Sequence, residues 1–168
     1  LEQLWLNDNK LTKVDVSKNS KLNVLNIVKN KLRFSTMPIA VDRDGKSVFG
    51  KYSYNLQEPL DVKCINGKGD LSSEAKVDGE ATNYRWFVGN ITVIDGEPQG
   101  EELESDEFSI ENGVTTLKLA GVANNLVCLM RNSRLPNLYQ ITNYISFDPN
   151  PTGVDGVGAG EDVKVQLV

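Results

Sequence analysis

The chain has 168 residues, with 18 basic and 23 acidic side chains, a net charge of −5 and no histidine. The lack of histidine excludes catalytic triads and zinc sites that use an imidazole, and two cysteines are too few for a Cys₄ metal site or an iron–sulfur cluster. The acidic balance argues against nucleic-acid binding, which needs clustered lysine and arginine, and the apolar runs are too short to span a bilayer. We therefore expect no cofactor, no metal and no catalytic activity.

An internal repeat opens the chain. The pattern L-x-x-L-x-[LI]-x-x-N-x-L occurs twice at an interval of 21 residues, and it is the signature of leucine-rich repeats. Its two copies consist of Leu1, Leu4, Leu6, Asn9, Leu11 and of Leu22, Leu25, Ile27, Asn30, Leu32. In such a solenoid the leucines point inward, and each asparagine amide bonds backbone groups that the turn leaves unpaired. The sequence thus predicts a leucine-rich-repeat domain over residues 1–38.

The residues between the leucines form the predicted ligand-binding face of this solenoid. Its members are Gln3, Trp5, Asn7, Val24, Asn26 and Val28. Trp5, expected beside Val24 and Val28, is the predicted anchor, because tryptophan is enriched at the energetic centres of interfaces. The alternative is that Trp5 only covers the exposed end of the solenoid. On the other side, Lys13, Asp15 and Ser17 are interpreted as simply polar.

The repeat region is short for a solenoid. Leucine-rich repeats need about three or more stacked coils to be stable, whereas two are recognisable here, and Leu1 stands in mid-pattern. We expect further repeats upstream of this sequence. We also expect self-association through the apolar, strand-edged end of the first coil.

Residues 39–59 are predicted to connect the repeats to a second domain. The segment Asp42–Gly45 has turn chemistry. It also resembles the start of a calcium loop, but Lys46 occupies the place of an oxygen ligand, so a turn is predicted. Tyr52 and Tyr54 are expected to plug the end of the solenoid.

From residue 60 to 148, short alternating segments separated by turn signals predict an immunoglobulin-like antiparallel β-sandwich of about seven strands. Turns are predicted at 66–67, 78–79, 89–90 and 112–113, a second strand over 70–77 and a single last strand over 141–147. Trp86 is the predicted centre of the core. Residues 149–168 are predicted to form a glycine-rich linker and the start of a further strand.

The chain resembles Bacteroidetes-type cell-surface leucine-rich-repeat proteins in which an immunoglobulin-like domain follows the repeats. The resemblance rests on four segments: Leu11–Asn19, Arg33–Pro38, Asp70–Glu74 and Tyr84–Phe87. In addition, Thr152–Asp155 with the following EDVKVQLV is similar to the start of a C-terminal sorting domain. The resemblance implies a bacterial protein that is secreted or at the cell surface, peripheral to the membrane, adhesion-like and without catalysis.

We therefore expect a non-enzymatic protein that binds a host or neighbouring-cell surface protein through the repeat face. One alternative is a carbohydrate-binding accessory module in which Trp5 or Phe87 stacks on sugar rings, and another is a structural stalk. A third is a small hydrolase that uses the acidic run at 101–107. That run is expected to be solvated, because a flexible loop does not separate the pKa values of two carboxylates as acid–base catalysis requires.

The acidic run consists of Glu101, Glu102, Glu104, Asp106 and Glu107. The cysteines, Cys64 and Cys128, are expected to be two buried thiols rather than a disulfide, because their spacing relative to Trp86 departs from the immunoglobulin pattern.

Overall fold

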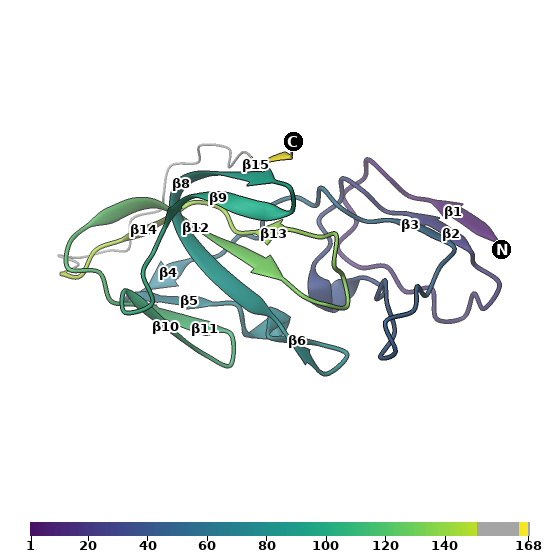
Figure 1. Ribbon diagram of the computed structural model, residues 1–168, viewed down its shortest axis with the longest axis horizontal. Helices are drawn as coiled ribbons and strands as arrows, with labels where there is room; N and C mark the ends of the chain where they lie inside the picture. The colour runs from purple at the N-terminus through teal and green to yellow at the C-terminus, as the bar shows by residue number, and fades with distance from the viewer. Residues whose placement is uncertain (151–164, 168) are drawn as a thin grey trace. The chain divides into compact units, whose positions relative to one another are not determined.

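The computed structural model describes residues 1–150 and 165–167, and the fold is mainly β (Figure 1). The chain divides into two compact units. The first contains residues 1–60, 73–83 and 130–140, and the second contains 61–72, 84–129 and the described residues from 141 onward. The predicted boundaries differ from this division, because they placed 73–83 and 130–140 in the sandwich. Among the described residues, no helix has the length and apolar character that crossing a membrane takes.

A parallel sheet organises the first unit. Its strands are β1 (Gln3–Trp5), β2 (Val24–Asn26) and β3 (Lys51–Ser53), in that order. The register pairs Gln3 with Val24 and Val24 with Lys51, so β2 follows β1 by 21 residues and β3 follows β2 by 27. The repeat pattern predicted the first two strands. The third lies in the predicted connector, where Tyr52 pairs with Leu25 of β2 and the buried Tyr54 follows the strand as the buried Ile27 follows β2.

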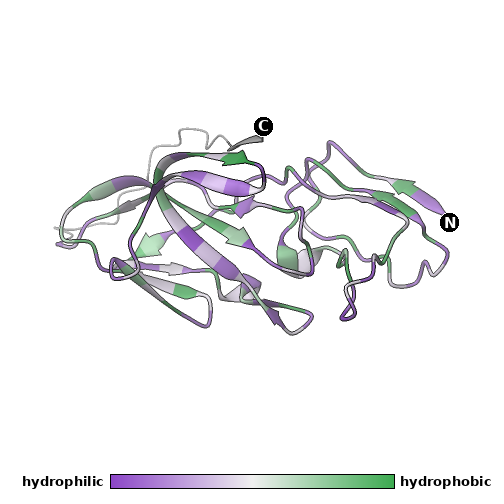
Figure 2. Ribbon diagram, in the orientation of Figure 1, coloured by the Kyte–Doolittle hydropathy of each residue, from purple (hydrophilic) through white to green (hydrophobic). Residues whose placement is uncertain are grey.

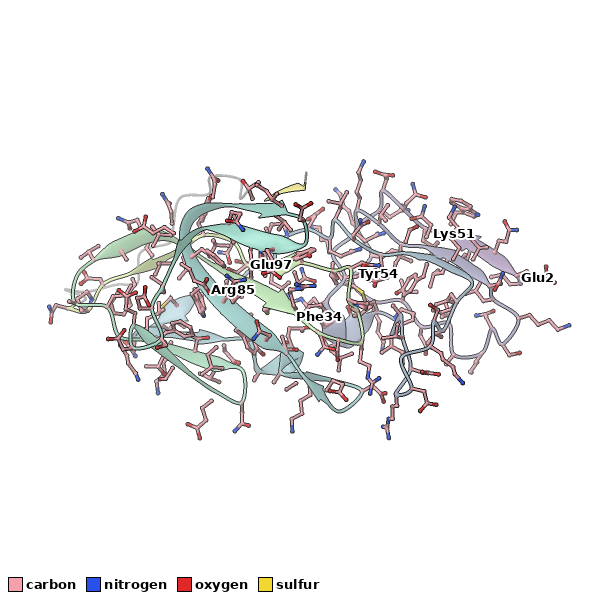
Figure 3. All side chains as sticks on the ribbon, in the orientation of Figure 1. Glu2, Phe34, Lys51, Tyr54, Arg85 and Glu97 are labelled. Atoms are coloured by element: carbon pink, nitrogen blue, oxygen red, sulfur yellow. The ribbon has the colours of Figure 1, made fainter. Side chains whose placement is uncertain are left out.

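The core of the first unit is apolar and aromatic. The buried members include Leu22, Leu25, Ile27, Leu32, Phe34, Met37, Phe49 and Tyr54. The Tyr52 ring lies edge-on to Phe49 at 4.9 Å between centroids, and 4.5 Å from the ring of Tyr54. The Tyr52 hydroxyl donates to the Pro38 carbonyl at 2.9 Å. Figure 3 labels Phe34 and Tyr54 in this interior.

Asn30 holds the turn of one coil against the next, as the sequence predicted. Its side chain is fully buried. Its amide donates to the carbonyl oxygens of Leu6, Ile27 and Val28 at 2.9, 3.1 and 3.2 Å, and its Oδ1 accepts from the Leu11 N–H at 3.0 Å. Such bonds satisfy backbone groups that would otherwise be buried without partners.

Gln57 performs the same task one coil later. Its amide donates to the Ile27 and Tyr54 carbonyls at 2.9 and 2.8 Å, and its Oε1 accepts from the Leu32 N–H at 3.2 Å. The 21-residue period did not reveal Gln57, because the third coil is longer and carries a different amide. Its bonds nevertheless continue the pattern that Asn30 begins.

A hairpin accounts for the extra length of the third coil. The predicted turn at Asp42–Gly45 is confirmed: the Asp42 Oδ1 accepts from the backbone N–H groups of Asp44 and Lys46, both at 2.9 Å. A bridge between Val41 and Ser47 closes the hairpin.

Two further sheets contain most of the strands of the second unit, and the ends of β8, β12 and β13 at residues 83, 130–131 and 140 belong to the first unit (Figure 1). One contains, in order, β10 (Phe108–Glu111), β11 (Val114–Leu117), β5 (Lys68–Asp70) and β4 (Cys64–Ile65). The other contains, in order, β13 (Gln140–Ile141), β12 (Ala123–Arg131), β8 (Asn83–Ile94) and β15 (Val165–Leu167). In addition, β14 (Ile145–Phe147) pairs with β12, and β9 (Glu97–Glu102) pairs with β8.

Short elements complete the fold. A two-stranded hairpin consists of β6 (Lys76–Val77) and β7 (Glu80–Ala81). Two 3-10 helices, η1 (Phe34–Thr36) and η2 (Ser72–Glu74), each make a single turn.

Trp86 packs the two sheets of the second unit against each other, so its predicted place at the core is confirmed. It is fully buried on β8. Its indole Nε1 donates to the Thr115 Oγ1 of β11 at 3.3 Å. On β5, Gly69 lies beside the indole, since a Cβ added there would be 3.9 Å from the Trp86 ring, an ordinary contact distance.

Three of the predicted turns are confirmed, and one is wrong. The pairs at 66–67, 78–79 and 112–113 have positive φ and join antiparallel strands. At 89–90, by contrast, β8 continues without a turn. Gly89 has a φ of 75° and lies where the pairing of β8 with β9 shifts register. The turn into β9 is Asp95–Gly96, with φ of 51° and 81°, where the sequence predicted no turn.

Two predicted strands are also wrong in extent. Residues 70–77 are not one strand, because β5 ends at Asp70 and η2 begins at Ser72. The Asp70 carboxylate accepts a hydrogen bond from the Ser72 N–H at 2.9 Å at this junction. Residues 141–147 are divided between β13 and β14. Between them the Asn143 Oδ1 accepts from the Val62 N–H at 2.7 Å, and this bond accompanies the break.

The predictions for the C-terminal segment and the cysteines have mixed outcomes. The predicted linker at 152–160 lies outside the described residues. Of the predicted strand after it, Val165–Leu167 form β15, which pairs in parallel with β8. Cys64 and Cys128 are not joined by a disulfide. Cys128 is buried as expected, whereas Cys64 is only half-buried, so the expectation of two buried thiols is wrong for Cys64.

Candidate functional site

The outward side chains of the parallel sheet form the candidate site. We call it the β1–β3 face and define it by Gln3, Trp5, Val24, Asn26, Lys51 and Ser53. Two rows cross the strands: Gln3, Val24 and Lys51 form one, and Trp5, Asn26 and Ser53 form the other. Leu25, between Val24 and Asn26, is fully buried, as the alternation of a strand requires.

Trp5 is the exposed large apolar side chain of this face, at 57 %. The register places Asn26 directly beside it, so Val24 and Val28 are its diagonal neighbours rather than its direct ones. Glu2 and Lys51 are exposed at the surface of the same unit (Figure 3). The face therefore offers one large aromatic surface with amide, hydroxyl and ammonium groups around it.

The remaining predicted site residues, Asn7 and Val28, lie just beyond the strand ends and are half-buried. The Asn7 amide donates to the Asp8 carboxylate at 2.6 Å, and the Val28 N–H donates to the Asn26 Oδ1 at 3.2 Å. These bonds fix the border of the face. Conversely, Lys51 and Ser53 were missed by the sequence analysis, because the 27-residue step to β3 breaks the repeat period.

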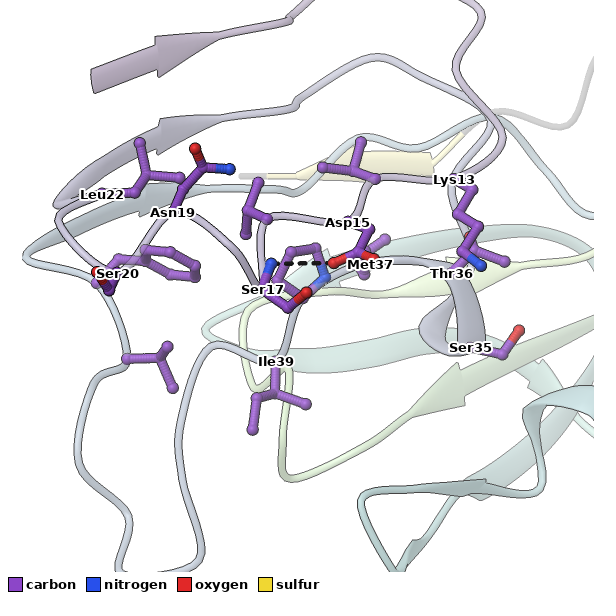
Figure 4. A pocket seen from close by; sticks show the side chains of 15 residues that line it. Lys13, Asp15, Ser17, Asn19, Ser20, Leu22, Ser35, Thr36, Met37 and Ile39 are labelled. Atoms are coloured by element: carbon purple, nitrogen blue, oxygen red, sulfur yellow. Dashed lines mark hydrogen bonds between the residues drawn. The ribbon is translucent and has the colours of Figure 1, made fainter. Parts of the chain in front are cut away.

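A groove of about 450 Å³ opens elsewhere in the first unit (Figure 4). Its floor contains the buried side chains of Leu22, Met37 and Phe49, and its border contains Lys13, Asp15 and Ser17. The Asp15 carboxylate accepts from the Ser17 N–H at 2.9 Å, and this bond lowers the pKa of Asp15. The sequence interpretation of the border residues as simply polar is thus incomplete. The groove itself gave no signal, because its walls come from segments distant in the sequence.

Phe87 is 1 % exposed, and the Arg85 guanidinium lies over its ring at 5.3 Å from the centroid. It cannot stack on a sugar, so that part of the carbohydrate hypothesis is wrong. Arg85 also donates two hydrogen bonds to the Glu102 carboxylate, at 2.7 and 2.6 Å. These bonds lower the pKa of Glu102.

The other side chains of the acidic run do not gather around a common point. Glu101 and Glu102 lie on β9, whereas Glu104, Asp106 and Glu107 follow it. The Glu107 carboxylate accepts from the Glu104 N–H at 2.8 Å. Within the described residues, no group of three or more acidic or cysteine side chains is arranged to hold a metal ion.

No family model matches the chain, and no curated protein or solved structure matches it either.

Proposed function

We propose that this chain is a non-enzymatic binding protein that recognises a protein partner through the β1–β3 face. The observation that carries the proposal is Trp5, which is 57 % exposed on a strand whose backbone is fixed by pairing with β2. A tryptophan held in place loses little conformational freedom on binding and buries a large area, which is why such residues dominate interface energies.

We infer that the scaffold of this face is a short leucine-rich-repeat solenoid and that an immunoglobulin-like sandwich follows it. The parallel strands, the buried leucines and the amide bonds of Asn30 and Gln57 support the solenoid. The two sheets that pack through Trp86 support the sandwich. In this proposal the solenoid presents the ligand face and the sandwich acts as a spacer.

An extracellular or cell-surface location in a bacterium, with an adhesion-like role, completes the proposal. It is supported by the resemblance of Leu11–Asn19 and Arg33–Pro38 to segments of surface leucine-rich-repeat proteins. Carbohydrate binding is the competing function, and after the burial of Phe87 it depends on Trp5 alone.

The experiment is a binding screen against immobilised extracellular-matrix proteins and a glycan array. The wild type is compared with Trp5→Ala and with Val122→Ser, which changes an apolar side chain that is 66 % exposed in the second unit. For a hot-spot residue we expect Trp5→Ala to weaken binding to a matrix protein by about 30-fold and Val122→Ser to leave it unchanged. Equal binding by all three proteins, or hits on glycans alone, would contradict the proposal.

A further inference from the structure

The groove of the first unit opens where segments of two successive coils part. Residues 13–16 alternate between exposed and half-buried side chains, which is typical of an extended segment. The Val14 N–H donates to the Thr36 carbonyl at 2.9 Å, and the chain continues from Thr36 into Met37 with extended backbone angles. Hydrophobic and hydrophilic stretches follow one another along the coils of this unit (Figure 2). Because successive coils run in the same direction, the bond at Val14 begins a parallel pairing.

Pro38 stops this pairing after one bond. In a parallel ladder the Val14 carbonyl would next accept from the N–H of residue 38, but proline has no N–H. The Val16 N–H would then donate to the Pro38 carbonyl, which instead accepts from the Tyr52 hydroxyl at 2.9 Å. Among the described residues, neither the Val14 carbonyl nor the Val16 N–H has a hydrogen-bond partner.

Both of these groups face the groove. Backbone groups alternate sides along an extended segment, so those of residues 14 and 16 face the side on which Thr36 lies. Val14 and Val16 line the groove, as do Met37 and Ile39 of the following coil. A coil that preceded the first one would adjoin the opposite side of the segment. The groove therefore lies between two coils that are both part of this sequence.

An apolar floor accompanies the two backbone groups. Leu22, Met37 and Phe49 are buried there, and Val48 beside them is 44 % exposed. Figure 4 labels Leu22 and Met37 among the lining side chains. The volume of about 450 Å³ lies within the roughly 300 to 1,000 Å³ of ligand sites, which combine apolar walls with a few polar groups.

We propose that this groove binds an extended peptide segment of a partner protein, parallel to residues 13–17 and with an apolar side chain against the floor. One residue of the peptide lies beside Asp15, donates its N–H to the Val14 carbonyl and accepts from the Val16 N–H, as in a parallel ladder. The side chain of the next peptide residue points to the same side as that of Val16, because side chains alternate along both segments. This residue is the apolar anchor.

The unpaired backbone groups select a peptide as the occupant. A small apolar molecule would cover the floor but would leave the Val14 carbonyl and the Val16 N–H without protein partners. One acceptor and one donor are the complement of the C=O and N–H that every residue except proline carries. In strand addition such main-chain bonds give affinity, and side-chain pockets give specificity.

The charges of the groove favour an uncharged segment. Of the lining residues, Lys13 and Asp15 carry charges, and these cancel. No residue of the groove belongs to the β1–β3 face, so the peptide would bind at a second surface. Loss of this proposal would leave the proposed function untouched.

NMR of the 15N-labelled full chain tests the pairing. The probe is the peptide acetyl-Ser-Ala-Leu-Ala-Ser-amide, whose leucine is the anchor. Its controls are the same peptide with serine in place of leucine, and N-acetyl-leucine amide, which keeps the anchor but lacks the residue that pairs beside Asp15. We expect the probe to move the Val16 amide resonance downfield, because the N–H gains a carbonyl acceptor, and to leave that of the buried Leu25 unchanged.

The dissociation constants separate the two parts of the proposal. We expect binding at least about tenfold weaker without the leucine side chain and at least about fivefold weaker for N-acetyl-leucine amide. Equal binding of the probe and either control would overturn the proposal. A Val16 resonance that shifts with chain concentration in the absence of peptide would also overturn it, because the occupant would then be a second copy.

A matched pair of variants locates the site. Val48→Ser removes an apolar side chain of the groove that is 44 % exposed, whereas Leu56→Ser removes one that is 49 % exposed in the same unit and does not line the groove. We expect Val48→Ser to weaken binding of the probe at least about threefold and Leu56→Ser to leave it unchanged. Equal binding by both variants would overturn the proposal.

Discussion

Replacement of Asn30 by alanine tests the stacking of the coils that carry the β1–β3 face. The substitution removes an amide that makes four hydrogen bonds in a fully buried site. Its three acceptor carbonyls belong to Leu6, Ile27 and Val28. Each keeps another donor, which is supplied by Asn9, Gln57 and Asp8 respectively.

The magnitude follows from which groups lose their partners. The Leu11 N–H loses its acceptor, and leaving such a group unpaired costs about 1 to 3 kcal/mol. The three lost bonds to carbonyls that remain paired add about 0.5 kcal/mol each. We therefore expect Asn30→Ala to lower the free energy of unfolding by about 2.5 to 4.5 kcal/mol.

Urea unfolding followed by circular dichroism measures this loss, and Asn9→Ala provides the control. Asn9 is the equivalent residue of the first coil, but it is exposed and donates only to the Leu6 and Asn7 carbonyls. Its replacement should cost less than about 1 kcal/mol. Equal losses for the two variants would refute the reasoning that burial of the amide, and not the repeat position, determines the stabilisation.

Three further predictions concern other parts of the chain. The hydrogen bonds from Arg85 lower the pKa of Glu102 below its usual 4.5. The ionised carboxylate therefore stabilises the fold above pH 4.5, and this stabilisation is lost as the pH falls through the lowered pKa. The unfolding free energies of the wild type and Glu102→Gln should converge at acidic pH, and a constant difference would contradict this. A Cβ at Gly50 would overlap the Asn23 amide, whose Oδ1 accepts from the Gly50 N–H at 3.1 Å. A Cβ at Gly121, by contrast, would meet nothing within 4 Å. In thermal unfolding, Gly50→Ala should therefore lower the Tm and Gly121→Ala should not. Burial raises the pKa of the Cys128 thiol and shields the thiol from reagents. Iodoacetamide should therefore label Cys64 alone in the native protein. Two labels in the intact mass spectrum would be inconsistent with the fold.

The sequence predicted those elements whose signal is local and periodic. The positions of β1 and β2 follow from a constant spacing of leucines, and the turns at 66–67 and 112–113 follow from Asn-Gly pairs that accept positive φ. β3 escaped prediction because a hairpin lengthens its coil and Tyr52 and Tyr54 replace the aliphatic residues. Gly89 was misread because a glycine at a strand irregularity has the same sequence context as a glycine in a turn.

The candidate site was predictable only where it coincides with the repeat. Gln3, Trp5, Val24 and Asn26 were found because the inward leucines fix the direction of their neighbours. Lys51 and Ser53 were not, since no leucine pattern surrounds them. The groove bordered by Lys13 depends on segments that are distant in the sequence, and a periodic pattern contains no information on such contacts.

The central claim, that the β1–β3 face binds a protein partner, is tested most directly by fluorine NMR of the fluorotryptophan-labelled chain. The chain has two tryptophans, of which Trp5 is exposed and Trp86 is fully buried. During titration with a matrix protein that the screen identifies, the Trp5 signal should shift or broaden while the Trp86 signal stays constant. An unchanged Trp5 signal at saturation of binding would contradict the claim.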